Sequence, residues 1–337
     1  MRLLRKLFRR DLAEAGTPDS GAAPAAGVRV TADELIRLRL VARDLRLGSR
    51  RPSLSTIAGA HHSRFRGRGM DYLESRGYQA GDDIRNMDWR VTARAGNPHV
   101  KLYTEERERP VVVMVDLNPG MFFGTRGAFK SVVAARAAAL IGWAAVHRHD
   151  RIGALLFNGS HHELRPLGGQ RGVLRLIRAL VGATDPATGV RQPEHSGRLT
   201  EALRRLRRVA RPGSLIYILS DFYDIDADTR LHLQRLRQHS DIVACQVVDA
   251  LEIHAPPPGR YGIGDGRHTT VMDTRSSARQ TAYDRYFARH HQDVRELMRA
   301  CKVPLIRLAT TDDVVERLRG SQPEGDQREA DTIEVAA

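Results

Sequence analysis

The chain has 337 residues, of which 41% are hydrophobic, so it can bury the core of one large domain or of two domains. Its formal net charge is +14, and the positive charge is almost all arginine spread along the chain, which we attribute to a GC-rich genome rather than to a nucleic-acid interface. No apolar run reaches the roughly 18 residues of a transmembrane helix, and the two cysteines lack the short spacing of a zinc site.

Residues 1–28 are predicted to form a basic amino-terminal segment followed by a flexible linker. Leu3, Leu7 and Phe8 share one helical face with basic residues around them, so three alternatives stay open: a helix on an anionic membrane, a frayed tail, or a helix docked on the domain. Secretion is not expected, because no apolar stretch of useful length follows the basic residues. We therefore predict a cytoplasmic protein, with peripheral contact to the inner face of the membrane as the membrane alternative.

Residues 29–109 are predicted to form an amino-terminal helix and a small, partly β accessory segment. Thr31 and Glu34 have the capping-box spacing, and apolar residues continue that helix to about residue 47. Residues 67–94 are rich in glycine, acids and arginine and have neither a helical nor a strand period, which predicts a loop. Residues 98–108 are predicted to be partly extended.

From residue 110 to about residue 310, unbroken apolar runs alternate with helical stretches. This order is typical of an α/β fold with a doubly wound, mainly parallel sheet whose strands are buried on both faces. The predicted strands are 111–115, 152–157, 215–219, 242–248 and 305–308. The predicted helices are 128–147, 173–181, 199–209, 228–238, 281–301 and 312–318. Residues 254–268 are predicted to be a loop before a short edge strand at Val271. The end of the chain, 311–337, is predicted to be a helix and a disordered tail.

Two acidic residues stand where predicted parallel strands end. Asp116 follows the strand 111–115, and Asp221 follows the strand 215–219. Ligands of such sheets bind at the carboxyl ends of the strands, and paired carboxylates with nearby hydroxyl or amide oxygens suit a hard cation such as magnesium. The alternative is that both carboxylates cap helices or accept loop amide bonds.

This arrangement resembles a von Willebrand factor A-type domain, a Rossmann-like fold that holds a metal on an Asp-x-Ser-x-Ser loop, a later Thr and a later Asp. Asp116 and Asp221 match the two aspartates, whereas Asn118 and Gly120 replace the two serines. Ser196 and Gly197 stand where the threonine is expected, and Thr200 lies inside the start of the following helix. The resemblance implies a degenerate metal-ion-dependent adhesion site of Asp116, Asn118 and Asp221, with Mg²⁺ as the cofactor.

The segment 67–94 resembles the signature of the domain-of-unknown-function 58 family, and the two resemblances together cover about residues 60–310. The signature residues are Gly67, Gly69, Arg76, Tyr78, Gly81, Asp82, Asp83, Arg85, Asp88, Trp89 and Arg94. Members of this bacterial family commonly lie beside MoxR-type AAA+ ATPases. The resemblance therefore implies such an ATPase as a partner, acting on an unknown client protein.

The acids of the signature also allow a catalytic hypothesis, because paired carboxylates can do acid–base work or hold a metal. We favour a buried ion-pair network of Asp82, Asp83 and Asp88 with the neighbouring arginines, joining the segment to the sheet. The adjacent histidine pairs, such as His290-His291, are predicted to lie on the surface. Cys245 and Cys301 lie in apolar stretches and are predicted to be buried free thiols.

We predict a non-enzymatic protein-interaction module that acts as an adaptor or co-chaperone of a MoxR-type ATPase. Its expected contact surface is the loop set around Asp116, Asn118 and Asp221, with or without a metal. The alternatives are a basic nucleic-acid-binding protein, whose affinity would fall steeply with salt, and a metal-dependent hydrolase using Asp82, Asp83 and Asp88.

Overall fold

The computed structural model describes residues 27–48, 70–105, 108–190, 197–264 and 269–320. Contacts divide the chain into a small unit, residues 51–108, and a large unit made of everything else. The predicted accessory segment 29–109 is therefore divided between them. Its first part belongs to the large unit because Leu35 and Leu47 are buried in the core of that unit.

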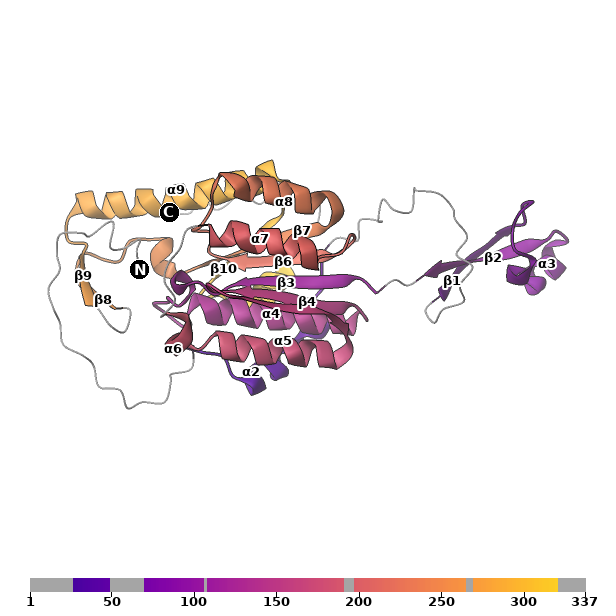
Figure 1. Ribbon diagram of the computed structural model, residues 1–337, viewed down its shortest axis with the longest axis horizontal. Helices are drawn as coiled ribbons and strands as arrows, with labels where there is room; N and C mark the ends of the chain where they lie inside the picture. Colours follow the sequence, from indigo (N-terminus) through magenta and orange to yellow (C-terminus); the bar gives the residue numbers. More distant parts are fainter. Residues whose placement is uncertain (1–26, 49–69, 106–107, 191–196, 265–268, 321–337) are drawn as a thin grey trace. The chain divides into compact units, whose positions relative to one another are not determined.

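The large unit is built on a six-stranded sheet in the order β10-β7-β6-β3-β4-β5 (Figure 1). Neighbouring strands are parallel, except that β5 runs antiparallel to β4. The strands are β3 Pro110–Asp116, β4 Arg151–Phe157, β5 His161–Gly168, β6 Leu215–Ser220, β7 Asp241–Val248 and β10 Leu305–Ala309. The predicted α/β fold with a mainly parallel sheet is confirmed. Sequence patterning missed β5 because this edge strand is polar and buries only Leu164.

Helices cover both faces of the sheet (Figure 1). One core lies under α2, α4, α5 and α10, and the other lies under α7, α8 and α9. The helices are α2 Ala32–Arg37, α4 Lys130–His147, α5 Gly169–Ala183, α6 Pro186–Gly189, α7 Arg198–Val209, α8 Ala227–His239, α9 Ser277–Ala300 and α10 Val314–Gly320. Short 3₁₀ turns are η1 Val41–Asp44, η4 Pro119–Met121 and η5 Ala250–Glu252. The six helices expected between residues 128 and 318 are all present.

The first helix is shorter than the predicted 31–47. Thr31 does cap it, accepting from the Glu34 amide at 3.3 Å. The indole Nε1 of Trp143 donates to the Leu35 carbonyl at 2.9 Å, and Arg39 N turns back to Ile36 O at 3.0 Å. In a continuing α-helix Leu35 O would accept from Arg39 N. The Leu35 carbonyl thus accepts from Trp143 of α4 where a longer helix would need it to accept from Arg39, and α2 ends at Arg37.

The small unit pairs β1 Met70–Gly77 with β2 His99–Glu105 in an antiparallel ribbon, and adds η3 Ile84–Asn86 and α3 Trp89–Ala95. The extended segment predicted at 98–108 is confirmed by β2. The loop predicted for 67–94 is wrong over β1 and α3. A two-stranded ribbon needs no apolar face of its own to pair its backbone, and α3 is too short to show a period. Gly67 and Gly69 lie outside the described residues.

A second antiparallel ribbon, β8 Arg260–Gly264 and β9 Thr269–Asp273, belongs to the large unit. The edge strand predicted at Val271 is confirmed by β9, whereas β8 falls in the predicted loop 254–268. Met272 of β9 packs with Tyr283 and Phe287 of α9 in a separate small core. Among the described helices, none is long and apolar enough to cross a membrane.

Candidate functional site at the carboxyl edge of the sheet

The carboxyl ends of β3 and β6 lie side by side at the centre of the sheet. Val115 of β3 is in register with Leu219 of β6, so the next residues, Asp116 and Ser220, end the two strands together. From β3 the chain next forms β4 on one side, whereas β6 lies on the other side, which makes this the switch point where doubly wound sheets bind ligands. The predicted pairing of Asp116 with Asp221 at one edge is thus present.

A lysine that sequence reasoning missed lies at the centre of this edge. Lys130 is the first residue of α4 and is only 1% exposed. Its Nζ donates to Asp221 Oδ2 at 2.8 Å and to Glu252 Oε1 at 2.7 Å, and it lies 5.4 Å from the ring centroid of Tyr223. The ammonium group therefore joins β6, η5 and α4 through two buried ion pairs and a cation–π contact.

The charge of Lys130 is held by its two carboxylates. Burial alone would lower the pKa of the ammonium group, but the attraction of Asp221 and Glu252 outweighs it, and the pKa is raised. Burial raises the pKa of Glu252, and Lys130 opposes that rise. One permanent cation thus neutralises part of a cluster that holds three buried carboxyl groups, those of Asp116, Asp221 and Glu252.

Asp116 is satisfied by its own surroundings. Ser220 Oγ donates to its Oδ2 at 2.6 Å, and the Asn118 amide donates to its Oδ1 at 2.9 Å. Burial, and then the nearby charge of Asp221, raise the pKa of Asp116 to about 7. These contacts match the alternative in which the carboxylates accept hydrogen bonds from their own loop.

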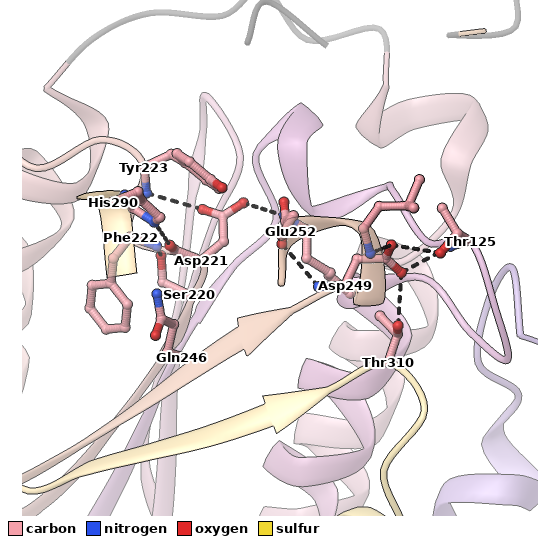
Figure 2. Close-up of polar contacts among 12 residues, drawn as sticks. Thr125, Ser220, Asp221, Phe222, Tyr223, Gln246, Asp249, Glu252, His290 and Thr310 are labelled. Carbon is pink, nitrogen blue, oxygen red and sulfur yellow. Dashed lines mark hydrogen bonds and ion pairs between the residues drawn. The ribbon is translucent and has the colours of Figure 1, made fainter. Parts of the chain in front are cut away.

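Asp221 is aimed by a strained turn. Phe222 has φ 57°, a left-handed conformation that is unusual for a bulky residue, and its amide donates to Ser220 Oγ at 2.9 Å. The Tyr223 amide donates to Asp221 Oδ1 at 3.3 Å, and His290 Nε2 donates to the Asp221 carbonyl at 2.9 Å (Figure 2). The ring of Tyr223 stacks on His290 with centroids 3.8 Å apart. Backbone and α9 together fix the carboxylate that Lys130 binds.

The third residue predicted to ligate a metal, Asn118, has a different partner, and so does Thr200, near the position where the metal-loop pattern expects a threonine. Arg198, 8% exposed at the start of α7, donates from Nη1 to Asn118 Oδ1 at 2.8 Å. Thr200 donates to Asp226 at 2.6 Å. A Cβ at Gly120 would lie 3.2 Å from Asp221 Oδ2, so a larger residue would crowd the carboxylate that Lys130 holds.

This donor set does not fit a resident magnesium ion, which needs near-octahedral oxygen ligands. A divalent cation would have to displace the Lys130 ammonium from Asp221 and break the bond between Arg198 and Asn118. Within the part of the chain that the structure describes, no group of three or more His, Cys, Asp or Glu side chains could hold a metal. The magnesium site stays a prediction.

Beside this cluster another buried acid, Asp249, anchors the loop that leads into α4. Asp249, fully buried after β7, accepts from the amide and hydroxyl of Thr125 at 2.9 and 2.7 Å and from Thr310 Oγ1 at 2.8 Å (Figure 2). Its own amide donates to Glu252 Oε2 at 2.9 Å. Glu252 therefore connects the Asp249 contacts to the Lys130 cluster, and the edge is one continuous polar network.

The prediction that the paired histidines lie on the surface is wrong for His291, which is 6% exposed. Its Nε2 donates to the Glu252 carbonyl at 2.8 Å, and its Nδ1 accepts from Gln246 at 3.1 Å. Burial lowers the pKa of His291 to about 4, so the ring is neutral at pH 7. Adjacent residues of a helix point in different directions, so α9 buries His291 and leaves His290 half-buried.

The signature acids of the small unit are occupied by structural contacts. Arg76 forms a two-pronged ion pair with Asp82 at 2.7 and 2.8 Å. Asp83 caps η3, and Asp88 caps α3 while accepting from Ser75 at 2.7 Å. The Ser75 bond, followed by those from the helix amides, lowers the pKa of Asp88. Of the predicted ion-pair network, the structure thus has the pair of Arg76 with Asp82, whereas Asp83 and Asp88 cap helices.

The remaining signature side chains lie toward water. Tyr78 is half-buried, whereas Gly81, Arg85 and Arg94 are exposed. Trp89 is 68% exposed, and Ile84 of the same unit is 61% exposed. In the large unit Asp116 and Asp221 are only 3% and 6% exposed, whereas Asn118 between them in the predicted contact loops is half-buried. Cys245 and Cys301 are buried free thiols, as predicted.

Sequence reasoning missed Lys130, Glu252, Arg198 and Asp249. One signal was available for the first of them. Lysine occurs at only four positions in this arginine-rich chain, and Lys130 begins the apolar, alanine-rich helix that follows the Asp116 loop. Glu252 and Asp249 follow β7 at the same edge of the sheet, but their partners come from distant segments.

The family described as "Protein of unknown function DUF58" matches residues 74–293 of this chain. Uncharacterized proteins of Mycobacterium bovis and of Mycobacterium tuberculosis strain H37Rv are each 30% identical over 279 residues, which is 82% of this chain and 86% of theirs. Among solved structures, a conserved hypothetical protein BatB from Bacteroides thetaiotaomicron has a TM-score of 0.39 and 13% identity, covering 63% of this chain and 96% of that one.

Proposed function

Because this chain belongs to the DUF58 family, whose function is unknown, we propose a role for it from its own residues: a non-enzymatic protein-interaction module. In this proposal it is an adaptor or co-chaperone for a MoxR-type AAA+ ATPase that matures or remodels a client complex. The large unit would have the von Willebrand factor A-like fold, which commonly presents loops at the carboxyl edge of its sheet. The small unit would carry the contact to the partner.

The exposed pair Trp89 and Ile84 carries this proposal. Tryptophan is enriched where protein interfaces concentrate their binding energy, and large exposed apolar side chains mark contact sites. Both lie in the signature segment, whose acids are already used in capping and in the Arg76 ion pair. The segment thus has an internal framework and presents two apolar side chains outward.

The charge around this pair indicates the partner's surface. Arg85, Arg90 and Arg94 are exposed and have no ion-pair partner among the described residues. An apolar contact with arginines at its rim fits a partner that offers an apolar recess bordered by acids, since complementary rims steer association. We refer to five exposed residues of the signature segment as the signature face: Ile84, Arg85, Trp89, Arg90 and Arg94.

The bonding and burial of the carboxylates at the carboxyl edge support a binding role rather than a catalytic one. The carboxylates there accept from Lys130, Ser220 and backbone amides, and they are nearly inaccessible to solvent. A general base needs access to the proton that it removes. The edge is better suited to holding loops in place than to acting on a substrate.

The test is binding of the full chain to the purified MoxR-type ATPase of the same organism, measured by biolayer interferometry with ADP and with a slowly hydrolysed ATP analogue. Trp89→Ala is expected to weaken binding at least tenfold. Leu174→Ala is the matched control, because Leu174 is an exposed apolar residue (43%) on α5 of the large unit and is expected to change affinity less than twofold.

Two results would contradict the proposal. The first is no binding of the wild-type chain in either nucleotide state. The second is equal loss of affinity in the Trp89→Ala and Leu174→Ala variants, which would indicate non-specific adhesion.

A basic surface on α7 and α8 supports nucleic acid as the second candidate partner. Arg204, Arg207 and Arg235 are exposed on these helices. After burial, their charges lower the pKa of His232. A duplex or single strand bound there would lose affinity steeply with salt. Fluorescence anisotropy with labelled DNA and RNA between about 50 and 200 mM salt separates this candidate from the first.

A further inference from the structure

We propose that the ammonium group of Lys130 permanently takes the place of a divalent cation at the carboxyl edge of the sheet. The edge then assembles without metal, and its loops keep one arrangement whether or not magnesium is present. This inference rests on the buried contacts of the large unit and does not depend on the proposed partner.

The first argument is that the ammonium group is buried and is bonded within the cluster. Nζ has three N–H donors. Two of them are taken by Asp221 Oδ2 at 2.8 Å and Glu252 Oε1 at 2.7 Å, and the face of the Tyr223 ring lies on a further side at 5.4 Å. Only 1% of the lysine is exposed, so the surrounding protein replaces the hydration shell of this charge. The cation is part of the core.

The second argument is that a single point lies within bonding distance of two carboxylate oxygens from separate segments. Asp221 follows β6 and Glu252 ends η5. Their oxygens both bond to Nζ. The ammonium group thus links two distant loops, as a metal ion does when carboxylates from both loops bind it. Lys130 reaches this point from the first turn of α4, so the cation arrives with the fold and needs no loading step.

The third argument is that the oxygens predicted to complete a metal site are held by other internal donors. Arg198 holds Asn118 Oδ1, and Ser220 and a backbone amide hold Asp116. A second internal cation, the Arg198 guanidinium, thus supplements the first. A divalent cation entering this cluster would be repelled by the positive charge of the Lys130 ammonium group.

The inference predicts the behaviour of two proteins. For the wild-type chain, the thermal midpoint is expected to be the same in EDTA and in millimolar Mg²⁺ or Mn²⁺, and calorimetric titration with Mn²⁺ is expected to show no binding at a one-to-one ratio. In Lys130→Ala the carboxylates of Asp221 and Glu252 lose their cation. This variant is expected to gain a rise of at least about 3 °C with Mn²⁺, because binding to the folded state alone stabilises it.

Matched variants assign the effect to this point. Lys302→Ala removes an exposed lysine and is expected to gain no response to Mn²⁺. Adding Glu252→Gln to Lys130→Ala removes one of the two carboxylates and is expected to abolish the gain.

The wild-type measurement decides the matter even if Lys130→Ala does not fold. One-to-one Mg²⁺ or Mn²⁺ binding by the wild-type chain that is lost in Asp221→Asn would overturn the inference. A folded Lys130→Ala variant with no response to Mn²⁺ would overturn it too, because the ammonium would then not stand at a point suited to a cation of that class. Neither readout involves the ATPase, so failure here is distinct from failure of the proposed adaptor role.

Discussion

Lys130 Nζ lies 2.8 Å from Asp221 Oδ2 although 91 residues separate them in the chain. Lys130 begins α4 after the loop that follows β3, and Asp221 follows β6, so the pair joins the two loops on either side of the switch point. Both side chains are buried: 1% of the Lys130 side chain and 8% of the Asp221 side chain are exposed. Breaking this bond is therefore expected both to release the two loops of the candidate site and to destabilise the fold.

Removing the charge of Lys130 is expected to destabilise the large unit strongly. Lys130→Met leaves two buried carboxylates without their cation, which costs about 3–5 kcal/mol of unfolding free energy. Urea denaturation followed by circular dichroism measures this loss. Lys302→Met, an exposed lysine, is the control and should stay within about 0.5 kcal/mol of the wild type. Equal stability of the two variants would contradict the buried ion pairs.

The carboxyl group of Asp116 is expected to make stability fall as pH rises. Its pKa is about 7 in the folded state and near 3.8 when exposed, so the folded chain holds a proton that the unfolded chain has lost between those values. The contribution of Asp116 to stability therefore declines from pH 4 to pH 7, by at most about 1.4 kcal/mol per pH unit, and levels off above pH 7.

Asp116→Asn removes this titration while leaving an acceptor for the Asn118 amide. The difference in unfolding free energy between wild type and variant, measured at several pH values, isolates the contribution of Asp116. A difference that is constant across pH 4–7 would show that the folded pKa is not raised.

His291 is expected to act in the opposite direction. Its pKa is lowered from 6.5 to about 4 by burial, so the unfolded chain binds a proton that the folded chain does not bind in this window. Stability is lost as pH falls from 6.5 to 4. His291→Gln keeps a donor for the Glu252 carbonyl and should flatten this part of the profile. A variant profile parallel to that of the wild type would refute the assignment.

The two tryptophans of the chain are expected to differ in solvent access. Trp89 is 68% exposed, whereas Trp143 is 2% exposed and bonded to the Leu35 carbonyl. Acrylamide should therefore quench Trp143→Phe, in which only Trp89 emits, several times more strongly than Trp89→Phe. Equal quenching would mean that the signature face is covered in solution, and it would remove the main support for the adaptor proposal.

The central strands β3 and β6 could be predicted because each is an unbroken apolar run. Val111–Val115 and Leu215–Leu219 are buried on both faces, and this burial is what selects such runs. The edge strand β5 could not be found in this way because it buries only Leu164 and pairs through its backbone. Strand β1, which pairs with the expected β2, was missed because its segment shows no strand period.

The sequence by itself determined the alternation of strands and helices, and hence that Asp116 and Asp221 come to one edge of the sheet. This follows because hydrophobic periodicity acts over a few residues and parallel strands align their carboxyl ends. Only the tertiary structure decided what these acids contact. Lys130, Glu252 and Arg198 lie at separate places in the chain, and their pairing depends on how loops from β3, β6 and β7 close over the sheet. Contacts between single side chains that are far apart in sequence leave no period to read, which is why the buried cation was found only in the folded chain.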